Sequence, residues 1–499
     1  MKKNINTRKS NILFIALCLW ITSCRGTDNA ITDENNNNGT PFNVIVNLTG
    51  TAIEESSVAK TATTGGSKVT ATRVQQFVVP FDGMTNATVT LTPERPVFGT
   101  QASVNPVAGI PLITELGNNV IYKVVVYKTD GSFVDEKTFT YKVNNTNDQQ
   151  GFMLDGDKTY TFVAYSVNST TTVPSVASGT RTLATDKLSG INGDLMYFSK
   201  NMMVSGNGKN YIDVVLKHKF TNITTVIDAT GVGNVSLVNN ARISPVGTSA
   251  DMNLSDGSLT YNASGSNVPV LNFKTLGNQK VTSDSNILIS NNVANTNPAK
   301  LDIGTLIVGG TPQDNFSINN IDITPGNKYN LVVKLGPCRK ELYRTDINTA
   351  NGSSKTLTLP ASDLGIIFDI YKLDDSFNLT INGIKIAENE IYFAGSRGIY
   401  FADGSKYESG GIDKVWFMNG NASAPVVRVV VNKDGKVSMY GAKASQGRLY
   451  PLVLVPGNSF NTVKWNTSGN NVIVSQFAGI GSTLINGDAI GIQSIPCTP

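Results

Sequence analysis

Residue types that support catalysis or metal binding are scarce in this chain of 499 residues. Only one histidine, His218, and four cysteines are present. A Ser-His-Asp or Cys-His site would have to use that histidine, and a structural zinc site would lack the required ligands and spacing. The segment 206–209 (Gly-Asn-Gly-Lys) lacks the upstream glycine and the Ser or Thr of a phosphate-binding loop. We therefore expect a protein without catalytic residues, metal or cofactor.

Charge is also sparse, because Asp, Glu, Lys and Arg make up only 16% of the residues. The chain has 41 Lys and Arg against 37 Asp and Glu. This excess of four is equalled by four basic residues at the N-terminus, which are Lys2, Lys3, Arg8 and Lys9. Without them the net charge is zero, so the sequence gives no electrostatic reason to expect nucleic acid as a partner.

Long apolar runs are absent too. Residues 12–21 form an apolar stretch far shorter than the about 20 residues that span a bilayer. Together with the basic start and the sequence Ile-Thr-Ser-Cys that ends at Cys24, it predicts a lipoprotein signal over 1–23 and a lipid on Cys24. An ordinary secretory signal with an unrelated cysteine is the alternative. Two or three acyl chains would hold the protein stably on a membrane, with the polar residues 24–40 as a flexible tether.

Two other cysteines, Cys338 and Cys497, each follow a proline. They bracket a segment that has the length of one domain, so we predict a disulfide between them in an oxidising compartment. Closing so long a loop would contribute roughly 4–5 kcal/mol in the chain-entropy model. Two independent buried thiols are the alternative.

Strand patterns dominate the chain, and no long stretch keeps a helical period. Residues 42–48 alternate between apolar and polar positions, which is typical of a half-buried strand. Dipeptides typical of hairpin turns recur at Asp130-Gly131, Asn382-Gly383, Asp403-Gly404 and Asp434-Gly435. We predict an all-β protein of tandem β-sandwich modules, with further strands at 77–81, 87–92, 120–128 and 158–166 and modules at 41–185, 186–337 and 338–499.

Carboxylates and aromatic residues are the remaining candidates for a functional site. A glycosidase needs two carboxylates about 5–10 Å apart, and Asp155/Asp157, Asp374/Asp375 and Asp434 are candidates, although their settings favour turns. Sugar-binding sandwiches expose aromatic faces, for which the third module offers Trp416, Tyr440 and Trp465 as candidates, besides Phe417 and Tyr450. These residues could equally fill its core. Residue His218 shares an apolar strand face with Ile212, Val214 and Leu216, so we expect it in the core, donating to a backbone carbonyl.

Four segments resemble those of the fimbrillin-like surface lipoproteins of Bacteroidetes. They are the signal that ends at Cys24, 160–166 (YTFVAYS), 194–197 (DLMY) and 215–220 (VLKHKF). The resemblance implies two β-sandwich domains exported to the outer membrane or cell surface, where family members build pili or sit at their base or tip. The acidic, Asn-rich tether resembles the export signals of such lipoproteins.

The resemblance also implies partners. In polymerising members a protease cuts after an arginine and releases the first strand, and a C-terminal strand of the next subunit then joins the sheet edge. Here 42–48 would be the removable strand and Arg73 the cut site.

The third module, sandwich-like or jelly-roll-like, sets the chain apart from main pilus subunits. Its segment 368–378 resembles a strand-turn-strand of C-terminal modules in Flavobacteria surface proteins. We expect a structural or adhesive accessory, tip or anchor component. The alternatives are a surface lipoprotein that binds glycan or a host surface through this module, and a glycosidase.

Overall fold

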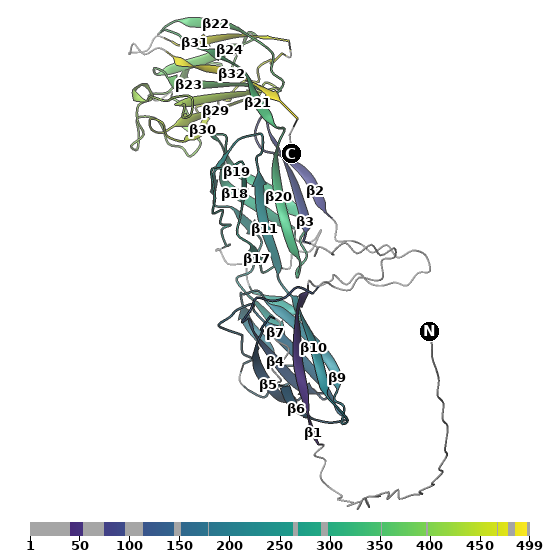
Figure 1. Ribbon diagram of the computed structural model, residues 1–499. Helices are drawn as coiled ribbons and strands as arrows, with labels where there is room; N and C mark the ends of the chain where they lie inside the picture. The colour runs from purple at the N-terminus through teal and green to yellow at the C-terminus, as the bar shows by residue number, and fades with distance from the viewer. Residues whose placement is uncertain are drawn as a thin grey trace, which may run out of the picture.

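The computed structural model describes residues 40–52, 74–94, 113–143, 151–177, 179–262, 268–290, 298–350, 352–395, 398–466, 468–477 and 485–496. Within these ranges all regular elements are strands, apart from one short 3-10 turn, η1 (Val415–Phe417), which confirms the predicted all-β class. The strands form three bodies stacked end to end (Figure 1). No helix among these residues is long and apolar enough to cross a bilayer.

The first body contains a seven-stranded and a three-stranded sheet. In spatial order the larger sheet comprises β5 (Phe133–Thr140), β4 (Ile121–Lys128), β7 (Thr159–Ser166), β9 (Met196–Met203), β10 (Asn210–His218), β1 (Pro41–Ala52) and β6 (Gly151–Asp155). The smaller sheet comprises β15 (Leu259–Tyr261), β14 (Ala250–Asn253) and β8 (Lys187–Ile191).

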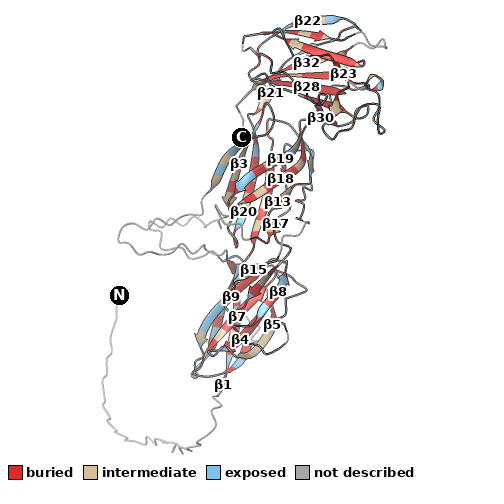
Figure 2. Ribbon diagram, turned by 180° about the vertical axis from the view of Figure 1, so that it is seen from behind, coloured by how far each residue is buried: buried red, intermediate tan, exposed pale blue. Residues whose placement is uncertain are grey.

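Both faces of the larger sheet are apolar. In β4, Val124 lies in one core and Val125 in the other, because successive side chains of a strand point to opposite faces. The smaller sheet covers the second face and contributes Leu188 and Met252 to that core. Figure 2 shows such buried residues along the strands of all three bodies.

The other face of the larger sheet is covered by the curl of the sheet itself, since its two edge strands meet. Lys137 Nζ of β5 donates a hydrogen bond to the carbonyl oxygen of Gly151 in β6 at 2.5 Å. The rings of Phe139 and Phe152 from the same two strands pack with centroids 6.2 Å apart. The result is a barrel-like body whose interior holds the apolar side of β1.

The second body is a sandwich. One sheet comprises, in order, β16 (Lys280–Thr282), β11 (Thr221–Asp228), β20 (Lys328–Gly336), β3 (Asn86–Pro93) and β2 (Gln75–Pro80), with β17 (Asn286–Leu288) also on β11. The other comprises β12 (Val235–Asn239), β18 (Ala299–Val308) and β13 (Arg242–Ser244), with β19 (Thr311–Ile321) also on β18. The core between them includes Ile223 and Leu331 from the first sheet and Leu301 and Ile318 from the second.

The chain crosses repeatedly between these two bodies. Strands β2 and β3 belong to the second body although they lie within the module predicted at 41–185, and β9 and β10 belong to the first body although they lie within 186–337. The sheets therefore do not follow a boundary near residue 186. Apolar alternation determines which face of a strand is buried, but long-range pairing selects its partners. Residue 338 lies between β20 and β21, where the third body begins.

The third body is a second sandwich. Its larger sheet comprises, in order, β21 (Arg339–Asp346), β32 (Asn486–Ser494), β23 (Gly365–Lys372), β28 (Val427–Asn432), β29 (Val437–Ala442), β30 (Leu449–Val453) and β27 (Tyr400–Phe401). The opposite sheet comprises β22 (Ser354–Leu359), β31 (Asn470–Ser475), β24 (Ser376–Ile381) and β25 (Ile384–Lys385), with β26 (Ile391–Tyr392) also on β24. Phe368, Phe377 and Val472 are fully buried between the sheets.

Candidate functional site

Strand β1, the predicted removable strand, is an inner strand of the first body (Figure 1). It runs parallel to β10, from Val44 opposite Asn210 onward, and antiparallel to β6. Its side chains Val44, Val46 and Leu48 are at most 8% exposed. Removal of β1 would therefore open a groove with an apolar floor and two unpaired strand edges.

Three residues of the predicted sites lie outside the described residues. They are the lipidation site Cys24, the cut site Arg73 and the cysteine Cys497. Strand β1 ends at Ala52 in the first body and β2 begins at Gln75 in the second. The segment that carries Arg73 therefore joins two different bodies, and cleavage at this arginine stays a prediction.

The last strand, β32, is held on both sides. It pairs with β21 along one edge and with β23 along the other. Just after it, Ile495 N donates to the carbonyl oxygen of Cys338 at 2.8 Å, two residues before Cys497. Cys338 is 2% exposed and takes part in a disulfide. Its pairing with Cys497 stays a prediction, to which the proximity of Ile495 lends support.

The three predicted ligand-binding aromatics lie in different settings. Trp465 is in the core of the third body, and its indole N–H donates to the carbonyl oxygen of Ser362 at 2.9 Å. Trp416 is half-buried in η1 beside Phe417, which is 69% exposed. Tyr440 is buried, and this burial raises its pKa to about 12. Of the three, Tyr440 alone lines a cleft of about 810 Å³ among the described residues.

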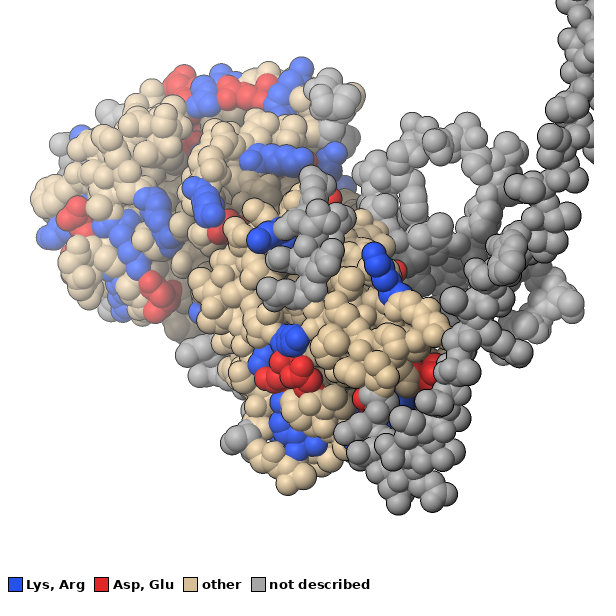
Figure 3. Space-filling model, turned by 60° about the horizontal axis from the view of Figure 1, so that its bottom comes forward, with Lys and Arg blue, Asp and Glu red and all other residues tan. Residues whose placement is uncertain are grey.

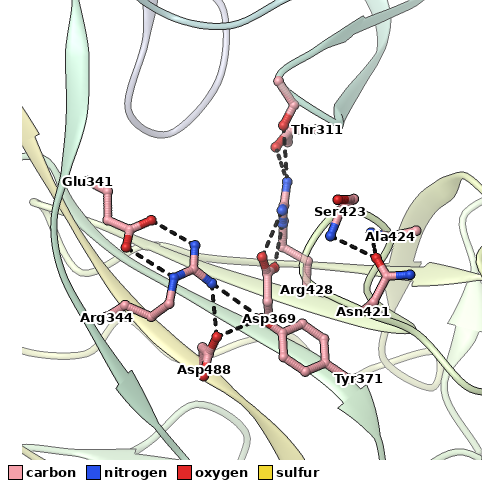
Figure 4. Close-up of polar contacts among 11 residues, drawn as sticks. Thr311, Glu341, Arg344, Asp369, Tyr371, Asn421, Ser423, Ala424, Arg428 and Asp488 are labelled. Atoms are coloured by element: carbon pink, nitrogen blue, oxygen red, sulfur yellow. Dashed lines mark hydrogen bonds and ion pairs between the residues drawn. The ribbon is translucent and has the colours of Figure 1, made fainter.

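An arginine that the sequence did not single out holds the second and third bodies together (Figure 4). Arg428 of β28 makes two hydrogen bonds to the Asp369 carboxylate, with Nε 2.6 Å and Nη2 2.9 Å from its oxygens. Its Nη1 donates across the interface to Thr311 Oγ1 at 3.1 Å and to the carbonyl oxygen of Gly309 at 3.3 Å. We call these residues the Arg428 clamp.

An apolar contact reinforces the clamp. Met84, from the turn between β2 and β3 in the second body, packs among Tyr440, Leu449 and Ile490 of the third body. On the same side, Arg339 Nη1 donates to Thr85 Oγ1 at 3.3 Å. The buried Met84 side chain and the hydrogen bonds from Arg428 and Arg339 therefore connect the two bodies.

The histidine and the carboxylates do not form a site for nucleophilic or acid–base chemistry among the described hydrogen bonds. His218 is 28% exposed, and its Nδ1 lies 2.8 Å from Asp194 Oδ1, so the expectation of a core histidine on a backbone carbonyl was wrong. His218 is the last residue of β10, where the buried face of the strand ends.

The carboxylate candidates lie at the end of a strand or in the connections between strands. Asp155 pairs with Lys158 at 2.7 Å, and Asp157 has the positive φ of a turn residue. Asp434 lies with Gly435 between β28 and β29. Burial and the neighbouring Asp374 raise the pKa of Asp375. No cluster of three or more His, Cys, Asp or Glu suited to a metal ion occurs in the described part of the chain. On the face drawn in Figure 3, acidic and basic side chains are interspersed.

Comparison with known proteins finds similar solved structures. They include a protein described as a cell adhesion protein from Bacteroides fragilis (11% identity, TM-score 0.32, 49% of this chain and 92% of that one). They also include the fimbrial anchor protein Mfa2 from Porphyromonas gingivalis (12% identity, TM-score 0.32, 58% of this chain and 90% of that one). A third is a fimbrial assembly protein from Parabacteroides distasonis (13% identity, TM-score 0.28, 43% of this chain and 83% of that one). Neither a family model nor a curated protein matches the chain.

Proposed function

We propose that this protein is a non-catalytic, fimbrillin-like lipoprotein of the bacterial cell surface, with a structural or adhesive role at the end of a fimbria or as an accessory component. Its lipid would be attached to Cys24, and its three bodies would project from the membrane. The paired environment of the first and last strands supports this proposal most strongly.

The first strand couples the anchor to the fold. The lipid on Cys24 would lie N-terminal to β1, which is paired on both sides within a sheet, between β10 and β6. A cut at Arg73 would leave β1 and its lipid attached to the three bodies only through backbone pairs and apolar contacts. An anchored protein is therefore expected to keep the chain intact.

The last strand argues against a repeating shaft subunit. A subunit that donates its C-terminal strand to a neighbour needs that strand to be free. Here β32 is paired on both edges within the third body, and Ala489 in it is fully buried. Donating β32 would require the sandwich of the third body to open.

The experiment compares native cells that express the wild type, Cys24→Ser or Arg73→Ala. We expect the wild type and Arg73→Ala to stay with the cell envelope at full length and to be digested by protease added to intact cells. Cys24→Ser should be shed into the medium. A ladder of detergent-resistant oligomers whose chains begin at Val74, present in the wild type and lost in Arg73→Ala, would instead show a polymerising shaft subunit.

A further inference from the structure

A groove lies where the third body meets the second. Its main part, about 810 Å³, lies between Gly304, Thr305 and 312–315 of the second body and the strands β29 and β30 of the third. Figure 1 shows β30 next to β19 at this junction. A second pocket of about 420 Å³ shares Leu454, Asn458 and Ser459 with it. The two pockets therefore adjoin at these residues, and together they are called the groove below.

The walls of the groove are held in place before any ligand arrives. Arg428 donates a hydrogen bond to Thr311, which precedes Pro312 in the wall formed by the second body. Arg428 itself belongs to β28, which pairs with β29 in the wall formed by the third body. Met84 packs against Tyr440, which itself lines the groove. Preformed clefts at domain junctions are frequent ligand sites, because little conformational freedom is lost on binding.

The polar groups of the groove are short, mostly neutral, and come from both walls. The second body contributes the side chains of Gln313, Asp314 and Asn315, and the third body contributes Asn458 and Ser459. Asp314 accepts a hydrogen bond from Thr305 Oγ1 at 2.7 Å through Oδ1. Amides of this kind can both donate to and accept from vicinal hydroxyl groups, and a carboxylate can accept from them.

An arginine in the groove is oriented without an ion pair. The guanidinium of Arg448 lies 4.3 Å from the ring centroid of Tyr450, and among the described residues no carboxylate pairs with it. The ring supports one face of the guanidinium by a cation–π contact. Its N–H groups are thereby available to oxygen atoms of a ligand.

Positive charge is not in excess in the groove. Asp403 in the lining forms an ion pair with Lys443 at 2.6 Å, so Arg448 is the remaining basic residue of the lining, beside the acidic Asp314 of the main part and Glu388 and Glu390 of the second pocket. The groove therefore offers no field that would attract a strongly anionic polymer. Apolar surface comes from Tyr440, Leu452 and the half-buried Phe460.

We propose that this groove binds a neutral oligosaccharide along its length. A sugar chain presents hydroxyl groups at its edges and C–H groups on its faces. The amides, Asp314 and Arg448 would bind the hydroxyls, and the aromatic and aliphatic side chains would pack on the C–H faces. The adjacency of the two pockets favours a chain of several sugar rings over a single ring. The inference gives the adhesive role of the proposed function a ligand class and depends on display at the cell surface.

The test uses the full-length lipoprotein in detergent and isothermal titration calorimetry. The probes are maltohexaose, cellohexaose, mannohexaose and xylohexaose, the matching disaccharides, and an oligogalacturonate as the acidic probe. We expect at least one neutral hexasaccharide to bind more tightly than its disaccharide and than the oligogalacturonate. Arg448→Ala and Asp314→Asn should each weaken this binding about tenfold or more, because each removes a charged partner of the hydroxyls.

Phe417→Ala is the matched control, since this exposed ring lies outside the groove. It should bind like the wild type, and all variants should keep the wild-type melting temperature. The proposal is overturned by binding that survives both Arg448→Ala and Asp314→Asn, by binding that depends on Phe417, by preference for the acidic probe, or by no binding of any hexasaccharide. Anchoring through Cys24 is measured separately on cells, so failure of the groove would leave that result intact.

Discussion

Replacing Arg428 by methionine tests the clamp that joins the second and third bodies. The variant leaves the Asp369 carboxylate without its partner in a setting where its side chain is only 2% exposed. It also removes the hydrogen bonds to Thr311 and Gly309 across the interface. Methionine retains most of the apolar stem, so the main change is the loss of the guanidinium.

The expected loss of folding free energy follows from the burial of the ion pair between Arg428 and Asp369. Breaking a buried ion pair by removing one partner destabilises a protein by about 3–5 kcal/mol. In a unit of this size each kcal/mol lowers the melting temperature by about 2–4 °C, so the third body should melt on the order of 10 °C lower. Differential scanning calorimetry of the full chain, with the transition of each body followed separately, measures this shift.

Two further variants separate the ion pair from the interface. Arg428→Met combined with Asp369→Leu removes both charges and should recover most of the lost stability. Thr311→Val removes one hydrogen bond across the interface and leaves the ion pair intact, so it should lower the free energy of unfolding by about 0.5–1.5 kcal/mol. A melting temperature for Arg428→Met within 2 °C of the wild type, or a double variant as unstable as the single one, would refute this account of the clamp.

Three other variants probe the third body and its contact with the second. Met84→Ala should weaken the packing between the second and third bodies by roughly 2 kcal/mol or more, because it leaves a cavity. The connection between the two bodies should then be cleaved faster by protease, and an unchanged cleavage rate would contradict the packing of Met84 against the third body. Cys338→Ser should lower the free energy of unfolding, measured in urea, by about 4–5 kcal/mol. An unchanged midpoint of the urea transition would show that the disulfide closes no long loop. Burial raises the pKa of Glu390 above its ordinary 4.5, so the folded state binds the proton more tightly and ionisation at neutral pH opposes folding. Glu390→Gln should therefore melt higher at pH 7, with a difference that fades below the ordinary pKa of 4.5, and a lower melting temperature at pH 7 would contradict this sign.

Local structure was largely predictable from local pattern. Residues 42–48 lie within β1 with Val44, Val46 and Leu48 buried as the alternation predicted. Asp130-Gly131 connects β4 to β5 and Asp434-Gly435 connects β28 to β29, with both glycines at positive φ. Strand faces and hairpin turns depend on residues within a few positions of each other, so the alternation of side chains and the turn dipeptides predict them directly.

Long-range partners were not predictable. Nothing in the alternation of β3 shows that it pairs with β20 instead of β4, the strand that follows it. Arg428 and Asp369 are 59 positions apart and lie in two separate strands. Their ion pair could therefore not be predicted from the residues around either one. Tyr440 lies in β29 and lines a groove, and the register of strand pairing decides which face it occupies. Trp465 lies outside the strands, in the connection between β30 and β31, and still fills a core.

Mass spectrometry of the protein extracted from its native membrane tests the central claim most directly. The account predicts an N-terminal Cys24 that carries a diacylglyceryl thioether, on a chain that continues through β1 and all three bodies to residue 499. A free thiol at Cys24, or a chain that begins at Val74, would contradict it.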